Sequence, residues 1–476
     1  MVQQIIPIEK NRAFALDALR GFAILTMVLS GVIPYGVLPA WMYHAQLPPP
    51  DHKFNPGLPG FTWVDLVFPL FLFALGAAIP LALSRRLDKG VPYRKIIFDI
   101  LERGFLLGFF AIFLRHVRPH VLNPNPTANS WLIAILGFFL MFAIFTRLPD
   151  SWNRWMRSSI RIVGWSGAIV LLALLRYPDD RGFSLARSDI IIIVLTNMAV
   201  FGSLIWLFTR NKLLVRLSLL GILIGFRLAN PEPGWVHWLW NFSPIPWIYK
   251  LYYLQYLFIV IPGTIVGDLL VKWMGNTDSE SGGTANWSPR RLIGISSLMI
   301  GFFIICLVGL QARWLWQTTV AGFLFCGIGW LLMKNPSTKT ESLLQTIFKW
   351  GVYWFILGFI FESFEGGIKK DHATLSYYFV TTGLSIFLLI AFTIIIDIFK
   401  QKRGLNMLID NGQNPMIAYV GIANFIWPIL ALTGLERVIL SITPTPWLGF
   451  LRGFIYTFLL ALMVSFFTRR KIFWRT

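Results

Sequence analysis

The sequence has few charged residues and almost no cysteine. Only 13% of its 476 residues are Asp, Glu, Lys or Arg, whereas soluble globular domains carry about 25%. So few charges cannot cover a water-facing surface, which argues against the soluble enzyme classes. The two cysteines, Cys306 and Cys326, stand within apolar runs, so they supply neither a disulfide framework nor a thiolate metal site. Walker, HExxH and GxSxG motifs are absent, and no metal is expected.

Apolar residues dominate instead, at 56% of the chain. A helix needs about 20 apolar residues to cross a bilayer. Segments 160–175 and 212–229 are the weakest candidates, so we expect 11 to 14 transmembrane helices in an all-α bundle that forms one domain, 1–476. The fourteen candidate spans are 13–33, 61–83, 96–115, 130–147, 160–175, 189–208, 212–229, 252–273, 291–310, 314–333, 346–364, 374–398, 413–433 and 447–467.

The positive charge indicates membrane topology rather than nucleic-acid binding. Lys and Arg exceed Asp and Glu by 20, and they stand between the apolar runs. With the N-terminus inside, the cytoplasmic segments hold 27 Lys and Arg and the outer segments 13. Cytoplasmic loops carry the excess of Lys and Arg, so both termini are predicted to be cytoplasmic. The polar stretch 275–289 is predicted to be a flexible cytoplasmic linker.

Polar residues within spans are functional candidates because they are costly in a membrane. Asp17 and Arg20 are spaced i, i+3 and can pair, either as a structural ion pair or at an acyl-donor site. Asn197 lies within a predicted span and is expected to form buried hydrogen bonds, either as a structural residue or at the donor site. Asn414, followed by Pro415, fits a helix N-cap, which provides simple capping or a phosphate contact.

The predicted first outer loop, 34–60, contains seven prolines and carries Trp41, His44 and His52. Proline stiffens the backbone, and a stiff loop suits a catalytic side chain. The alternative is a surface loop with incidental histidines. Asp65 stands at the outer end of the second span, close in sequence to this loop.

Further polar and aromatic residues are predicted at the outer face. Glu362 and Glu365, with Asp371 after them, are either solvated carboxylates or substrate ligands. Trp238 belongs to a tryptophan-rich loop, 230–250. These tryptophans are either interfacial anchors or a surface on which sugar rings stack.

Three sequence elements carry a resemblance to a known family. They are LDALRG at 16–21, His44, and TWVDLVFPLFLFALG at 62–76. Together they resemble the heparan-α-glucosaminide N-acetyltransferase family of transmembrane acyltransferases and its bacterial relatives. The resemblance to bacterial relatives implies a bacterial inner membrane. The resemblance implies an acetyl group from cytoplasmic acetyl-CoA, a glucosamine amine as acceptor on the other side, and an essential histidine in the first non-cytoplasmic loop, which is His44 here. The stretch 48–60 is an insertion relative to the animal members of the family, so the identity of the acceptor stays open.

The predicted function is therefore a membrane-embedded acyltransferase. His44 acts as base or as acetyl carrier, and Asp65 orients its ring. A transporter or flippase of a sugar-containing substrate is the main alternative, and a non-catalytic relative is another. The expected partners are the lipid bilayer, acetyl-CoA and an amino sugar or glycan, and a homodimer stays open. The candidate donor-binding residues are Asp17, Arg20, Asn197 and Asn414, and the candidate acceptor-binding residues are Trp41, Trp238, Glu362 and Glu365.

Overall fold

The computed structural model describes residues 13–36, 38–149, 151–179, 181–275 and 287–476, which fold into helices and loops without a β-strand. Twelve helical segments in these ranges are long and apolar enough to cross a membrane. They are α1 (Phe14–Val32), α2 (Trp63–Asp88), α5 (Ala128–Phe145), α6 (Arg154–Leu174), α7 (Ile190–Thr209), η2 with α10 (Leu251–Gly275), α11 (Pro289–Gln311), α12 (Leu315–Leu332), α13 (Lys339–Ile360), α14 with η4 (Leu375–Ile398), α16 with η5 and α17 (Pro415–Leu432), and α19 (Pro446–Arg469).

The predicted polytopic helical bundle is confirmed, and twelve spans fall within the expected range. The other two candidate spans are also helical, as α3 (Tyr93–His116) and α8 (Leu213–Ala229). Charged residues crowd the first half of α3, and α8 has only 17 residues. The predicted linker 275–289 falls mostly outside the described residues. The remaining helices are short: η1 (Ala40–Met42), α4 (Pro119–Leu122), α9 (Trp235–Asn241), α15 (Asn406–Gln413) and α18 (Leu435–Ile442).

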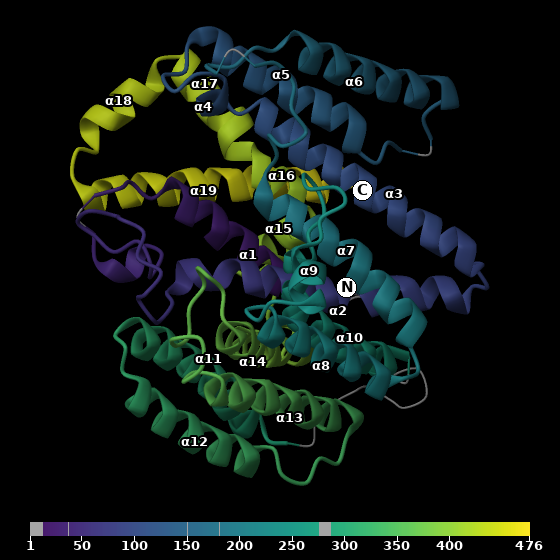
Figure 1. Cartoon of the computed structure of the whole chain (residues 1–476), viewed down its shortest axis with the longest axis vertical. Coiled ribbons are helices and arrows are strands. Elements are labelled where there is room, and N and C mark those ends of the chain that lie inside the picture. The colour runs from purple at the N-terminus through teal and green to yellow at the C-terminus, as the bar shows by residue number, and fades with distance from the viewer. Residues whose placement is uncertain (1–12, 37, 150, 180, 276–286) are drawn as a thin grey trace, which may run out of the picture.

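The middle of the bundle is built on close contact between α2 and α10, with α14 beside them (Figure 1). A Cβ atom at Gly76 would lie 2.3 Å from Val260 O, and one at Gly263 would lie 2.5 Å from Phe73 O. Only glycine allows two helix backbones to approach this closely, as in other membrane helix pairs. This contact fixes α2, which carries Asp65 at one end.

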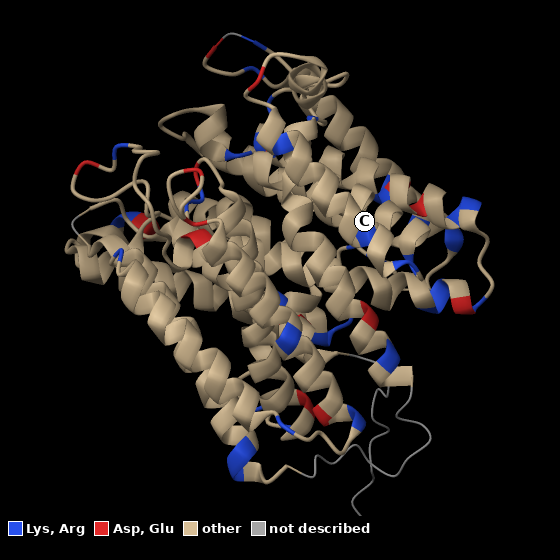
Figure 2. Ribbon diagram, turned by 60° about the horizontal axis from the view of Figure 1, so that its bottom comes forward, with Lys and Arg blue, Asp and Glu red and all other residues tan. Residues whose placement is uncertain are grey.

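The loops fall at two opposite ends of the bundle. At one end, Gly60 N donates to Ile368 O at 2.7 Å, which joins the loop before α2 to the segment before α14. At the other end, α15 lies against the start of α1 through Gly412, and Asp410 pairs with Arg469 at the end of α19. The start of α1 and the end of α19 therefore lie opposite the loop that carries His44. Charged residues lie mostly near helix ends and in loops, while the long helical faces are largely uncharged (Figure 2).

Candidate active site

Asp65 and His44 meet at the start of α2. Asp65 is the third residue of this helix, and its Oδ2 accepts from Thr62 N at 3.0 Å, which is one half of a capping box. The same oxygen accepts from Ala45 N at 3.0 Å, so the carboxylate also holds the loop. The other oxygen, Oδ1, lies 2.6 Å from His44 Nδ1. The Asp65 side chain is fully buried, whereas that of His44 is 31% exposed.

This geometry determines the tautomer of His44. An ionised carboxylate only accepts hydrogen bonds, so a contact of 2.6 Å requires the proton on Nδ1. The lone pair is then on Nε2, the nitrogen that does not face Asp65. A histidine arranged in this way can take a proton from a reacting group. The structure thus brings together the two residues predicted to be catalytic, while their role in catalysis stays a prediction.

Two residues from distant parts of the chain complete the surroundings of this pair, and sequence reasoning missed both. Lys370 Nζ lies 3.1 Å from His44 Nδ1 and 3.8 Å from Asp65 Oδ1. The hydroxyl of Tyr377, in the first turn of α14, donates a hydrogen bond to the backbone oxygen of Asp65 at 2.5 Å. Lys370 directly precedes Asp371, in the segment that the sequence analysis singled out for its carboxylates. That segment was the sequence signal that could have pointed to Lys370.

The four predicted acceptor-binding residues lie on three different segments: η1, α9 and the segment after α13. Glu365 forms an ion pair with Arg227 at 2.6 Å and accepts from Leu375 N at 2.7 Å, so it joins α8 to the start of α14. Glu362 is half-buried, and burial raises the pKa of its carboxyl. Trp41 in η1 and Trp238 in α9 are both exposed on the surface.

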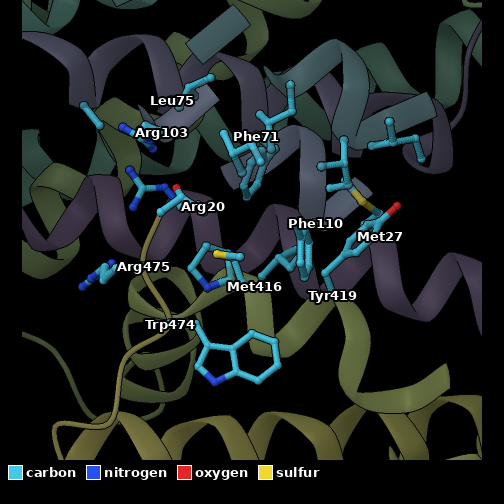
Figure 3. A pocket seen from close by; sticks show the side chains of 18 of the residues that line it. Arg20, Met27, Phe71, Leu75, Arg103, Phe110, Met416, Tyr419, Trp474 and Arg475 are labelled. Carbon is cyan, nitrogen blue, oxygen red and sulfur yellow. The ribbon is translucent and has the colours of Figure 1, made fainter. Parts of the chain in front are cut away.

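A cavity of about 330 Å³ lies between α1, α2, α3, α7 and α16. Its lining is mostly apolar, and three arginines lie together on one side of it: Arg20, Arg103 and Arg475. Figure 3 shows the apolar Phe71, Phe110 and Met27 on the other side. Along α2 the lining runs from Phe68 to Ala82, which is about 21 Å of helix at 1.5 Å per residue. Phe68 follows Asp65 by three residues, about 4.5 Å along the helix axis.

The predicted donor-binding residues have different surroundings. Asp17 and Arg20 pair at 3.7 Å, as their spacing predicts, and Arg20 lines the cavity and donates to Gly412 O at 3.2 Å. Asn197 does not line the cavity: it donates to Ile193 O and to Ile248 O, which holds the segment before η2 against α7.

Asn414 stands at the N-cap of α16, as predicted, but its side chain forms no capping hydrogen bond. Its Nδ2 donates to Ile472 O at 2.8 Å, and its Oδ1 accepts from Trp474 N at 3.1 Å, so it holds the C-terminal segment. Pro415 does occupy the first turn of α16, as predicted. By fixing Trp474, Asn414 places the following residue, Arg475, at the cavity. The described residues contain no cluster of three side chains suited to a metal.

Comparison with known proteins agrees with the sequence motifs. The heparan-alpha-glucosaminide N-acetyltransferases of Mus musculus and Homo sapiens are 30% and 31% identical to this chain over 115 residues. That stretch covers 24% of this chain and 14% of the length of each relative. This distant similarity confirms the resemblance and indicates a relationship to an acyltransferase. The family described as "Domain of unknown function (DUF5009)" matches residues 12–270, more than half of the chain, and the chain therefore belongs to this family.

Proposed function

We propose that this protein transfers an acetyl group from acetyl-CoA to an amino sugar or glycan on the other side of the membrane. The observation that carries the proposal is the His44–Asp65 pair at one end of a bundle whose cavity reaches to within one helical turn of Asp65. The positive-inside rule supports an orientation with His44 outside and the arginine-lined side of the cavity toward the cytoplasm. The distant similarity to two N-acetyltransferases supports the same reaction class.

The arginines and the apolar wall suit the two parts of such a donor. Guanidinium groups bind phosphate oxygens through short, charge-assisted hydrogen bonds. In this proposal Arg20, Arg103 and Arg475 contact the phosphates of acetyl-CoA, and the thioester arm extends along α2 toward Asp65. Holding the thioester and the acceptor in place supplies a large part of the rate enhancement, roughly 7–11 kcal/mol in favourable cases.

His44 moves the proton in the proposed reaction. The acceptor nitrogen attacks the thioester carbonyl carbon, and His44 Nε2 takes the proton that this nitrogen loses. The carbon–sulfur bond breaks, and the thiolate of CoA leaves with the proton from Nε2. The products are the N-acetylated acceptor and free CoA. Asp65 holds Nδ1–H throughout and stabilises the ring while it is charged.

One observation favours a transporter or flippase as the second candidate. Helices α15 and α16 are separated by a break at Asn414, whose φ and ψ are −134° and 52°, and the cavity contacts Pro415 just after the break. Broken helices beside a cavity are typical of transporter substrate sites. A transporter would move its substrate unchanged, whereas the proposed enzyme changes it.

The test uses purified protein with isotope-labelled acetyl-CoA, glucosamine and, as a matched control, glucosamine with its amine already acetylated. We expect label on glucosamine alone, detected by mass spectrometry, and about 10²–10⁴-fold less of it with the His44→Ala variant. Uptake of unchanged sugar into vesicles without acetylation would favour the transporter instead.

Sidedness is tested separately with single cysteines at Asp51 and Ser281, in a chain whose two native cysteines are replaced. An impermeant thiol reagent applied to intact cells should label only the cysteine at position 51. Labelling at position 281 alone would reverse the proposed orientation.

A further inference from the structure

Lys370 brings a positive charge to the His44–Asp65 pair. Its Nζ lies 3.1 Å from His44 Nδ1 and 3.8 Å from Asp65 Oδ1. Because Nδ1 already donates to Asp65, this nitrogen has no lone pair with which to accept from the ammonium group. Lys370 therefore acts on the ring through its charge.

The backbone around Lys370 is fixed on both sides. Before it, Ile368 O accepts from Gly60 N at 2.7 Å. After it, Ala373 O accepts from Arg227 at 2.6 Å. Both Ile368 and Ala373 are buried, at 2% and 5% exposure. The ammonium group thus extends from an anchored segment, and the Lys370 side chain itself is only 22% exposed.

Among the described residues, three charged groups lie at the ring or next to it. Asp65 contributes a negative charge from α2, and Lys370 contributes a positive charge from the segment before α14. Asp371 Oδ2 lies 4.0 Å from Lys370 Nζ, but its side chain is 49% exposed and is screened by water. With Asp65 alone, a proton on His44 would give a neutral ion pair. With Lys370 present, the same proton leaves a net positive charge beside a fully buried carboxylate.

We propose that Lys370 is a positioning residue of this site, whose ammonium group balances the charge of Asp65 and keeps His44 in its neutral, proton-accepting form. This inference rests on the proposed function for its purpose, because a base that is already protonated cannot take the acceptor's proton. It also eases the second half of the reaction, since the charged ring gives up its proton to the leaving thiolate more readily beside a second cation.

The test follows the protonation of His44 directly and needs no acetyl transfer. Diethyl pyrocarbonate modifies neutral imidazole, and the 31% exposure of the His44 side chain leaves it accessible. Modification of His44 is measured by peptide mass spectrometry between pH 4 and 9 in the full-length wild type and in Lys370→Met. The midpoint should rise by about one pH unit in the variant, as expected when a unit charge is removed beside a partly exposed ring.

Three further variants make the result specific. Lys370→Arg keeps the charge and should keep the wild-type midpoint. Lys369→Met, the neighbouring lysine, is the matched control and should also leave the midpoint unchanged. Lys370→Gln is a second neutral variant, used if the Met variant does not fold. An unchanged midpoint in both neutral variants would overturn the proposal.

The acid side of the pH–activity profile should move in the same direction as the modification midpoint. If the modification midpoint moves but no form of the protein transfers acetyl groups, the role of Lys370 stands and the proposed function fails. The two ideas are therefore tested independently.

Discussion

Replacing Asp65 separates the two tasks that its carboxylate performs. Oδ2 accepts from the backbone N–H groups of Thr62 and Ala45, and Oδ1 accepts from His44. Asp65→Ala removes the side-chain oxygen that accepts from both backbone N–H groups. An unpaired buried donor costs about 1–3 kcal/mol, so the loss for the two is roughly 2–6 kcal/mol. This is a large part of the stability of a typical domain, about 5–15 kcal/mol.

Asp65→Asn should retain the first task and lose the second. Its amide oxygen can take the place of Oδ2 and hold both backbone groups, while its NH₂ group faces His44. The ring must then accept on Nδ1, which moves its proton to Nε2 and blocks that nitrogen as a base. Losing a charge-assisted hydrogen bond of about 1.5–3 kcal/mol corresponds to a rate loss of about 10- to 150-fold.

The assay compares apparent melting temperatures in detergent with acetyl-transfer rates. We expect the Ala variant of Asp65 to melt several degrees below the wild type, and the Asn variant to melt close to it. The Asn variant should nevertheless be slow. Equal melting temperatures for the two variants, or an Asn variant as fast as the wild type, would refute the reasoning.

Three further predictions follow from the same geometry. His44→Ala should lower acetyl transfer by about 10²–10⁴-fold and leave acetyl-CoA binding intact. His52→Ala, on the same loop, should remain active. The reverse pattern in a rate assay would show that His44 is not the catalytic histidine. Arg475→Ala should weaken acetyl-CoA binding about 10-fold or more in calorimetry, as expected for the loss of a hydrogen bond to a charged group. Arg470 is exposed and does not line this cavity, so Arg470→Ala should leave the affinity unchanged. Equal affinities of the two variants would show that acetyl-CoA does not bind in this cavity. Burial raises the pKa of Glu362, so its ionised form destabilises the fold. Glu362→Gln should therefore melt at a higher temperature than the wild type near pH 8, and this difference should vanish below the ordinary carboxyl pKa of 4.5. A difference in melting temperature that persists at low pH would contradict burial as its cause.

The helices and the His44–Asp65 contact could be predicted because their signals are local. A span is encoded in about 20 consecutive apolar residues, and His44 and Asp65 are only 21 residues apart. Asp65 lies in the first turn of α2, where the chain leaves the loop, so a short stretch of sequence suffices to bring the two side chains together.

Lys370 and Arg475 could not be predicted because their positions depend on contacts across the whole chain. Lys370 is 326 residues from His44 and reaches it from the segment before α14, which hydrogen-bonds to Gly60. Arg475 reaches the cavity because the side chain of Asn414 holds the C-terminal segment 58 to 60 residues away. The Asn–Pro sequence suggested a local cap or a phosphate contact, and no periodic pattern indicates such a long-range hydrogen bond.

The measurement that tests the central claim most directly places the two substrates on opposite sides of a membrane. Vesicles containing the purified protein are loaded with glucosamine, and isotope-labelled acetyl-CoA is added outside. Molecules whose arginine-lined side faces outward should produce labelled N-acetylglucosamine inside the vesicles while no acetyl-CoA enters. Vesicles with His44→Ala should produce about 10²–10⁴-fold less. No labelled sugar inside the wild-type vesicles, or the same amount with His44→Ala, would contradict transfer across the membrane by this site.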